Sequence, residues 1–338
     1  MLPVQPDVLG RRGPSTGVQG CMHFVFCTLF DKNYLCKGLA LFESLQAHCL
    51  EFTLWVLCMD KPTSSFLEKM RLENVRLIAL EDFEDDALRE AKRNRTFAEY
   101  CWTCAAKLIF FVIQNEPTAD LVAYLDADLF FYSNPLPIYE ELGDGSILII
   151  GHRFSPEYQS SERTSGIYNV SMVIFRRDRD GLECLTWWKE RVLEACALDP
   201  EAGLCGDQKY LDDWPIRFRN VVVLKHKGGG LAPWNISNYH LSRKNGDVYV
   251  DSDQLIFYHF HSLQILGKRF LRKRAFLASK GYRFTKEQLA LVYLPYAREL
   301  ESAIKKVKEL VPGFISGDPS LRILDILRAY RNGNLLLV

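Results

Sequence analysis

The stretch "YLDADLFFYSNP", residues 124–135, places two carboxylates inside a run that otherwise has the pattern of a buried strand. Burying an unpaired carboxylate costs several kcal/mol, so a chain that keeps Asp126 and Asp128 in such a place needs a partner to neutralise them. Residues two apart on a strand point the same way, so both side chains can meet at one point. The pair is therefore a candidate binding site.

Three interpretations of this carboxylate pair are open. Carboxylates at the end of a strand can simply be solvated, and a carboxylate dyad can perform acid–base hydrolysis. Paired oxygen ligands also suit Mg²⁺ or Mn²⁺, which prefer octahedral oxygen coordination and often share a phosphate. Aromatic residues surround the pair and argue against plain solvation. The pattern favours a divalent ion that bridges to a diphosphate.

Strand-like and helix-like segments alternate along the first part of the chain. The run "HFVFCTL" (23–29) predicts a strand, and the apolar spacing of "YLCKGLALFESLQAH" (34–48) predicts a helix. Two more strands are predicted at "FTLWVLCMD" (52–60) and "VRLIAL" (75–80), with a short helix between them. This alternation is typical of βαβ units, so the sequence predicts an α/β fold with a mostly parallel central sheet flanked by helices.

The two ends of the chain differ from this α/β core. Residues 1–21 are rich in Pro and Gly and lack the apolar segment of a signal peptide, so they are expected to be disordered, with Met22 as an alternative translation start. Residues 22–265 are expected to form the α/β domain. Residues 266–338 carry a basic stretch and then a long amphipathic pattern, which predicts a C-terminal helical extension.

Composition excludes some classes of protein. Lys and Arg total 42, as do Asp and Glu, so the formal net charge is zero, which argues against a general nucleic-acid binder. No run approaches the roughly 18 apolar residues of a membrane-spanning helix. Most cysteines lie in apolar runs, as free thiols do in a reducing compartment, so a cytoplasmic location is expected. "CWTC" (101–104) lacks the second cysteine pair of a zinc site.

Asp126-Ala127-Asp128 follows "AYL" and is preceded by a helix with Ala106 and Lys107. This arrangement resembles the DxD motif of nucleotide-sugar glycosyltransferases of the GT-A fold. The likeness is to family eight, the glycogenin and lipopolysaccharide-galactosyltransferase type. It implies a GT-A (Rossmann-like) catalytic domain over residues 22–265, although a lone DxD is weak evidence.

Four further segments resemble this family, and they follow in the family's order. "FCTLFDKNYLCKGLALFESL" (26–45) resembles the nucleotide-binding opening, and "SGIYNVSMVIFRRD" (165–178) the Asn-containing strand beside the donor sugar. "GDQKYLDDW" (206–214) resembles the Asp-Gln segment at the sugar, and "LIFYHFHS" (255–262) the strand with the metal-binding histidine. Five segments in the right order are a strong signal.

The resemblance assigns roles to individual residues. It implies that Mn²⁺ or Mg²⁺ binds Asp126, Asp128 and His259. The residues expected to contact the UDP-sugar donor are Thr28, Asp31, Tyr34, Lys107, Asp126, Ala127, Asp128 and Lys268. The residues expected at the reacting sugar are Asn169, Asp207 and Gln208. The chain lacks the family's Lys-Pro-Trp after the histidine strand, and Lys268 is the replacement considered for that lysine.

Each assignment has a plainer alternative. Lys107 can be a surface lysine whose stem packs on apolar neighbours. His259 and His261 alternate along one strand, and either can be a satisfied core histidine. Asp207 can be an acid that caps a helix, and Asn169 can be a buried, hydrogen-bonded amide.

The resulting expectation is a metal-dependent UDP-sugar glycosyltransferase that acts on a glycan or lipid-linked acceptor, with retention implied by family eight. Its setting would be surface-polysaccharide or glycan synthesis of bacterial type. One alternative is a sugar-phosphate nucleotidyltransferase, which would need a Gly-rich signature that "CTLFDKNYL" (27–35) lacks. Another is a non-catalytic sugar-nucleotide-binding protein. The basic stretch 267–284 is expected to be solvated helix surface or a peripheral contact with an anionic membrane at its inner face.

Overall fold

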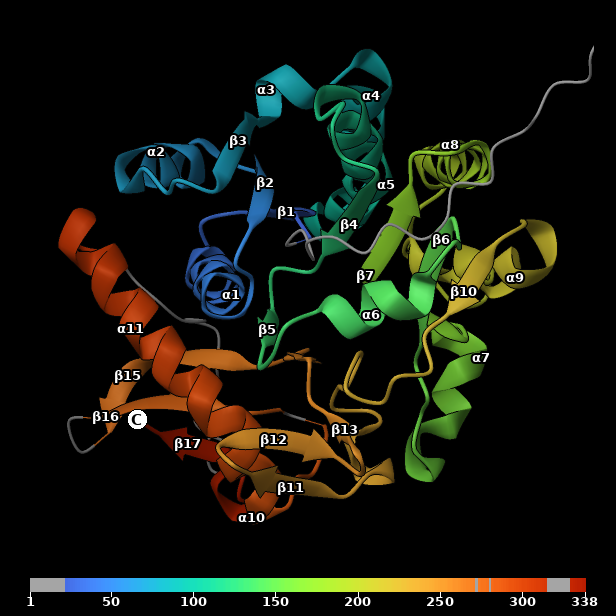
Figure 1. Ribbon diagram of the computed structural model, residues 1–338. Coiled ribbons are helices and arrows are strands. Elements are labelled where there is room, and N and C mark those ends of the chain that lie inside the picture. Colours follow the sequence, from blue (N-terminus) through green and yellow to red (C-terminus); the bar gives the residue numbers. More distant parts are fainter. Residues whose placement is uncertain (1–21, 271–272, 280, 315–328) are drawn as a thin grey trace, which may run out of the picture.

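The computed structural model describes residues 22–270, 273–279, 281–314 and 329–338 (Figure 1). A seven-stranded sheet with the order β10-β6-β7-β4-β1-β2-β3 forms its centre. Neighbouring strands pair in parallel except at β7, which runs antiparallel to both β4 and β6. The strands are β1 (Phe24–Phe30), β2 (Phe52–Cys58), β3 (Val75–Ala79), β4 (Leu121–Leu125), β6 (Ile147–Gly151), β7 (Tyr168–Arg176) and β10 (Val221–Val223). The predicted mostly parallel α/β sheet is confirmed.

Strand β1 shows why the sheet lies at the centre of the molecule. All seven of its residues are buried. Phe24 and Phe26 contribute to the hydrophobic core on one face of the sheet, and Val25 and Cys27 to the core on the other. A strand that is buried on both faces is rich in apolar residues, and six of the seven residues of "FVFCTLF" are apolar, with Thr28 as the exception.

Helices cover both faces of the sheet. Helices α1 (Leu35–His48) and α11 (Leu294–Leu310) contact each other and share the core of one face, while α5 (Phe97–Asn115) and α8 (Arg179–Glu194) share the other. Figure 1 shows these pairs on opposite sides of the sheet. The remaining helices are α2 (Lys61–Met70), α3 (Leu80–Phe83), α4 (Asp86–Arg93), α6 (Leu136–Leu142), α7 (Glu162–Ser165), α9 (Trp214–Arg217) and α10 (Lys286–Gln288).

Helix α5 corrects one expectation from the sequence. With 19 residues, it is long and apolar enough to cross a membrane by length and composition. Tyr100, Cys104, Leu108 and Val112 of this helix are buried in the core against the sheet. It starts at a capping box, in which the side chain of Thr96 accepts a hydrogen bond from the N–H of Glu99 and the Glu99 carboxylate accepts one from Thr96. Packing on the sheet accounts for its apolar character.

Short sheets connect the remaining segments. Strand β5 (Leu129–Phe131) pairs antiparallel with β14 (Phe257–His259), and β8 (Leu198–Asp199) with β9 (Leu204–Cys205). A three-stranded sheet contains β11 (Leu241–Lys244), β12 (Asp247–Val250) and β13 (Asp253–Gln254). A second one contains β15 (Gln264–Phe270), β16 (Lys273–Leu277) and β17 (Leu335–Leu337). The boundary expected between residues 265 and 266 therefore falls inside β15.

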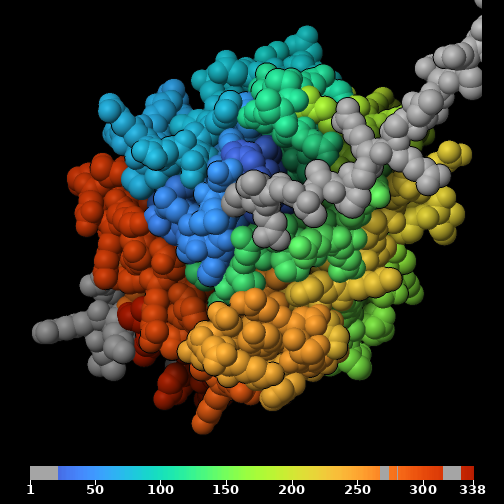
Figure 2. Space-filling view, in the orientation of Figure 1, coloured from blue at the N-terminus to red at the C-terminus, as the bar shows by residue number. Residues whose placement is uncertain are grey.

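The C-terminal part packs on the α/β core. Leu300 and Ile304 of α11 lie in the same hydrophobic cluster as Phe26 of β1. Figure 2 shows this end of the chain, in red and orange, against the blue N-terminal third. This contact makes α11 part of the fold that supports α1.

The basic stretch 267–284 includes the end of β15 and all of β16, which corrects the expectation of a helix surface. Arg274, which the sequence analysis counted in a possible membrane contact, is 3% exposed, and its guanidinium Nε pairs with Glu301. Arg272 and Lys280 lie outside the described residues, as do the side chains of Lys268, Arg269 and Lys273. The membrane contact of the other basic residues stays a prediction.

Candidate active site

The two carboxylates lie in a tight turn between β4 and β5. The run around the pair has the pattern of one buried strand, but β4 ends at Leu125 and β5 begins at Leu129. The backbone N–H of Leu129 donates to the carbonyl of Asp126 at 3.1 Å, and the N–H of Asp126 donates to Ser171 of β7 at 2.9 Å. The antiparallel neighbour β7 thus holds the turn that carries the pair.

Pairing of β5 with β14 brings His259 to this turn. His259 lies opposite Leu129 in the antiparallel register, and the N–H of Phe260 donates to the carbonyl of Asp128 at 3.0 Å. His259 Nε2 is 3.2 Å from Asp128 Oδ1 and 3.7 Å from Asp126 Oδ2. One ligand atom from each of the three residues lies within 4.8 Å of the other two. We call Asp126, Asp128 and His259 the metal wall.

The charges of the metal wall depend on one another. Burial opposes ionisation of Asp128, but Lys37 and His259 outweigh it and hold its pKa far below the usual range. Burial raises the pKa of Asp126 to about 6, against the influence of His259. Burial also opposes a proton on His259, yet Asp128 and Asp126 raise its pKa above 6.5. The buried Asp128 and the half-buried Asp126 thus favour the protonated form of the histidine between them.

Lys37 is a candidate site residue that the sequence did not indicate. It lies on α1 and is 6% exposed, and its Nζ is 3.4 Å from Asp128 Oδ2. The same ammonium is 4.2 Å from the centre of the Tyr34 ring. Its one sequence signal is a charge within the apolar run "LCKGLAL" (35–41), whose partner only the tertiary structure shows.

The metal wall fits a divalent cation. The Asp126 carboxylate accepts a hydrogen bond from the Tyr124 hydroxyl at 3.2 Å, and its histidine partner is 3.7 Å away. Its charge is therefore poorly offset by the protein. Two carboxylates and one imidazole nitrogen are suitable ligands for Mn²⁺ or Mg²⁺. An ion held there would remove the need for a proton on His259.

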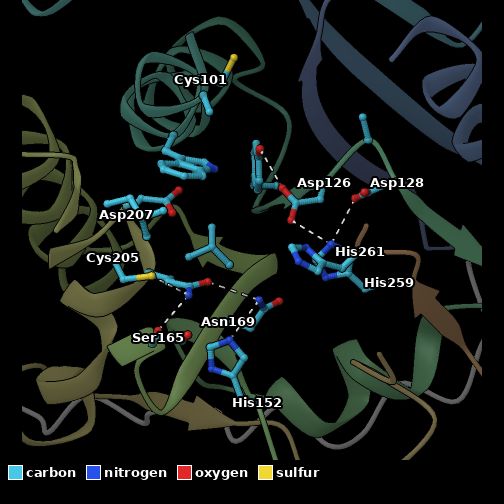
Figure 3. Close-up of a pocket in the computed structure, with 18 of the residues that line it drawn as sticks. Cys101, Asp126, Asp128, His152, Ser165, Asn169, Cys205, Asp207, His259 and His261 are labelled. Carbon is cyan, nitrogen blue, oxygen red and sulfur yellow. Dashed lines mark hydrogen bonds and ion pairs between the residues drawn. The ribbon is translucent and has the colours of Figure 1, made fainter. Parts of the chain in front are cut away.

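A cavity of about 520 Å³ opens beside the metal wall. Figure 3 shows Asp126, Asp128 and His259 on one side of it, Asp207 on the opposite side, and Asn169 next to His152. The structure brings most of the predicted site residues to this cavity. Those that line it are Asp31, Tyr34, Asp126, Ala127, Asp128, Asn169, Asp207, Gln208 and His259.

The side opposite the metal wall is built from amides and one carboxyl group. Asn169 Oδ1 accepts from the Ser171 N–H at 2.8 Å, and Asn169 Nδ2 lies 3.5 Å from Gln208 Oε1. Gln208 Nε2 donates to the Ser165 carbonyl at 2.9 Å. We call Asn169, Asp207 and Gln208 the amide wall. The side chains of Asn169 and Gln208 are positioned by these hydrogen bonds to the backbone.

Asp207 is the acidic member of the amide wall. It precedes the 3₁₀ helix at Gln208–Asp213, but its side chain makes no capping hydrogen bond, so the plainer alternative does not explain it. Burial and the negative charge of Asp126 raise its pKa well above the usual range. The Trp188 indole donates to its backbone carbonyl at 3.0 Å. Asp207 is thus fixed by its backbone, with its carboxyl group at the cavity.

Two predicted donor-binding residues do not line the cavity, and the side chain of a third is not described. Lys107 Nζ is 2.8 Å from Asp85 Oδ2, at the start of α4, and Lys107 is not among the residues that line the cavity. Thr28 is fully buried in β1, and among the described residues its hydroxyl has no hydrogen-bond partner. The side chain of Lys268 lies outside the described part of the chain. Their roles toward the donor stay predictions.

The aromatic floor of the cavity was also missed. Trp234 contacts three imidazole rings edge-on, with centroid distances of 5.3 Å to His152, 5.4 Å to His259 and 5.6 Å to His261. Its indole N–H donates to the His152 carbonyl at 3.0 Å. Trp234 thereby connects the metal wall to His152, which lies 3.5 Å from Asn169.

Comparisons with known proteins place the chain among relatives. No protein-family model matches it. It is 34% identical over 297 residues to the uncharacterized protein YfnD of Bacillus subtilis strain 168, covering 87% of this chain and 94% of YfnD. It is 33% identical over 307 residues to YfnF of the same strain, covering 88% of this chain and 99% of YfnF.

Solved glycosyltransferase structures are more distant. Galactosyltransferase LgtC, in complex with donor and acceptor sugar analogs, is 15% identical, with a TM-score of 0.48 over 82% of this chain and 96% of LgtC. Apo glycosyltransferase GlyE of Streptococcus pneumoniae TIGR4 is also 15% identical, with a TM-score of 0.49 over 84% of this chain and 64% of GlyE. The fold assignment rests on the sheet of this chain, which is mostly parallel with one reversed strand, and on the carboxylate turn after β4. The chain has a GT-A-like fold and belongs to the family of YfnD and YfnF.

Proposed function

We propose that the chain is a metal-dependent glycosyltransferase that moves a sugar from a UDP-sugar to a glycan or lipid-linked acceptor. The observation that carries this proposal is the metal wall, whose three ligand atoms lie within 4.8 Å of one another beside a cavity of about 520 Å³. Asp126 and Asp128 belong to a motif that resembles the donor-binding motif of family eight. That resemblance also supports retention of the anomeric configuration.

The two walls suit the two halves of such a donor. A divalent ion, when bound, stabilises the negative charge that develops on the leaving diphosphate. Asp126, Asp128 and His259 would hold this ion at one side of the cavity. Tyr34 is 43% exposed at the cavity and offers a ring for the uracil base. Asp31 closes the loop beside it by accepting hydrogen bonds from the backbone and side chain of Asn33 at 3.0 and 2.6 Å.

The amide wall suits the sugar. Asn169 and Gln208 present amide groups, which can hydrogen-bond hydroxyls both as donor and as acceptor. The negative charge of Asp126 is one cause of the raised pKa of Asp207. A cation bound at Asp126 would offset that charge and favour the ionised form of the Asp207 carboxyl group. The reacting carbon of the sugar would lie between the two walls. The cytoplasm, with synthesis of surface polysaccharide or another glycan, is the proposed setting.

Release of UDP from a panel of UDP-sugars tests this function. We expect turnover with a subset of donors in Mn²⁺ or Mg²⁺, and none in EDTA. Asp126→Ala should abolish turnover, because it removes a ligand from the metal wall. Asp144→Ala, which changes an exposed carboxylate, is the control and should keep it.

The alternative functions give different outcomes in the same assay. A nucleotidyltransferase would release pyrophosphate from UTP and a sugar phosphate, without releasing UDP from UDP-sugars. A binding protein would bind UDP-sugars and turn none over. UDP release that resists EDTA and survives Asp126→Ala would contradict the metal-dependent mechanism.

A further inference from the structure

Lys37 is a buried cation behind the metal wall. It lies on α1, where Ala40 and Leu41, one turn along the same face, are core residues. Taking an ammonium out of water is costly unless close partners offset the loss, so this position depends on the contacts that Lys37 makes. Lys37 is not among the residues that line the cavity. A bound molecule would therefore sense it through its partners.

The partners of Lys37 are two residues with separate predicted tasks. Asp128, 3.4 Å away, is a proposed metal ligand, and the Tyr34 ring, 4.2 Å away, is at the proposed nucleotide end of the cavity. Lys37 contacts Oδ2 of Asp128, whereas Oδ1 of the same carboxylate lies 3.2 Å from His259 Nε2. One ammonium group therefore contacts both the metal site and the nucleotide site.

Charge balance shows what this ammonium group does to a metal ion. Asp126 and Asp128 together carry two negative charges when ionised, which match one divalent cation. Lys37 adds a positive charge that leaves the loaded metal wall with an excess of one. Like charges repel strongly in a partly buried site, so the ion binds less firmly than the two carboxylates alone would allow. A diphosphate supplies the missing negative charge.

We propose that Lys37 is a positioning residue that couples binding of the divalent ion to binding of the nucleoside diphosphate. It weakens the hold of the metal wall on an ion alone, and the excess charge it creates is relieved when a diphosphate arrives. This inference rests on the proposed function. Because such coupling is reciprocal, the ion must improve nucleotide affinity by the factor by which the nucleotide improves ion affinity.

Calorimetric titration with Mn²⁺, with and without saturating UDP, tests the coupling in the full chain. Lys37→Met keeps an unbranched apolar stem and removes the charge. We expect it to bind Mn²⁺ alone about tenfold more tightly or better, because the repulsion is gone. The factor by which UDP improves Mn²⁺ affinity should fall by a similar amount.

Two further variants serve as controls. Lys306→Met removes another lysine–carboxylate pair, in which Lys306 Nζ of α11 lies 2.5 Å from Glu43 of α1, and should leave both Mn²⁺ affinities unchanged. Lys37→Arg keeps the charge and should retain most of the wild-type coupling.

Several outcomes would overturn the inference. Mn²⁺ affinity that is unchanged or weaker in Lys37→Met would do so, and so would an unchanged effect of UDP. Lys37→Gln is the second neutral variant, and if both neutral variants are unfolded by circular dichroism, Lys37 has only a structural role. Wild-type protein that binds no Mn²⁺ through Asp126 would refute the metal-dependent function itself. A normal wild type with an unresponsive Lys37→Met would refute only the coupling.

Discussion

The metal wall and the amide wall line one cavity, but their polar groups are balanced in different ways. In the metal wall, ionised groups face one another, with His259 3.2 Å and Lys37 3.4 Å from Asp128. In the amide wall, Asn169 and Gln208 bond to the backbone, and no ion pair within the described residues reaches Asp207. The first arrangement suits charged ligands and the second suits hydroxyl groups, as the two ends of a nucleotide sugar require.

The largest effect is expected from replacing His259, and the same change at His261 serves as the comparison. His259 Nε2 faces both carboxylates, whereas His261 is exposed at the cavity, and its pKa is lowered to about 4 by the surrounding protein and by His259. His259→Ala should weaken Mn²⁺ binding more than about a hundredfold, since it removes a direct ligand. His261→Ala should change it only a few-fold. Equal losses in calorimetry would mean that His259 is not the third ligand.

The metal wall also shows which of its ligands could be predicted from the sequence. Asp126 and Asp128 are neighbours in the chain, so their spacing alone indicated a shared site. His259 is 131 residues beyond Asp128, and its place followed from the family resemblance before the register of β5 and β14 showed it. Local spacing predicts local pairs, whereas strand pairing across the chain decides the third ligand.

Lys107 and Lys37 show which contacts the sequence could not predict. Lys107 was favoured because of its motif position on α5, but its ammonium is 2.8 Å from Asp85. Lys37 was overlooked because a charge in an apolar helix has no pattern that names its partner. The parallel sheet could be predicted because apolar runs such as β1 report burial on both faces directly. Which way a long charged side chain turns depends on neighbours from other elements.

The next effect concerns His152, which joins the two walls. It is 3% exposed, and burial, with the nearby charges of His259 and His261, lowers its pKa to about 4. Between pH 4 and 6.5 the unfolded chain therefore binds a proton that the folded chain does not. Stability should fall as the pH drops through this window, by at most about 3 kcal/mol, and this contribution should be fully present above pH 6.5.

Urea unfolding at several pH values measures this contribution. His152→Phe preserves an aromatic ring beside Phe154, which stacks on His152 at 4.6 Å, and should flatten the pH dependence between pH 4 and 6.5. His240→Phe, at an exposed histidine, should keep the wild-type slope. A His152→Phe protein with the wild-type slope would mean that His152 is protonated in the folded chain.

The smallest effect is expected in the amide wall, where the amides of Asn169 and Gln208 are proposed to contact a neutral sugar. Gln208→Ala removes an amide whose Nε2 is anchored on the Ser165 carbonyl at 2.9 Å and whose Oε1 lies 3.5 Å from Asn169. We expect kcat to fall about ten- to thirtyfold, the loss of one or two hydrogen bonds at the transition state, with UDP affinity unchanged. Gln159→Ala, at an exposed glutamine, should leave both unchanged. If Gln208→Ala weakens UDP binding as much as it lowers kcat, the amide wall contacts the nucleotide and the proposed difference between the walls is wrong. An unaltered kcat would also contradict it.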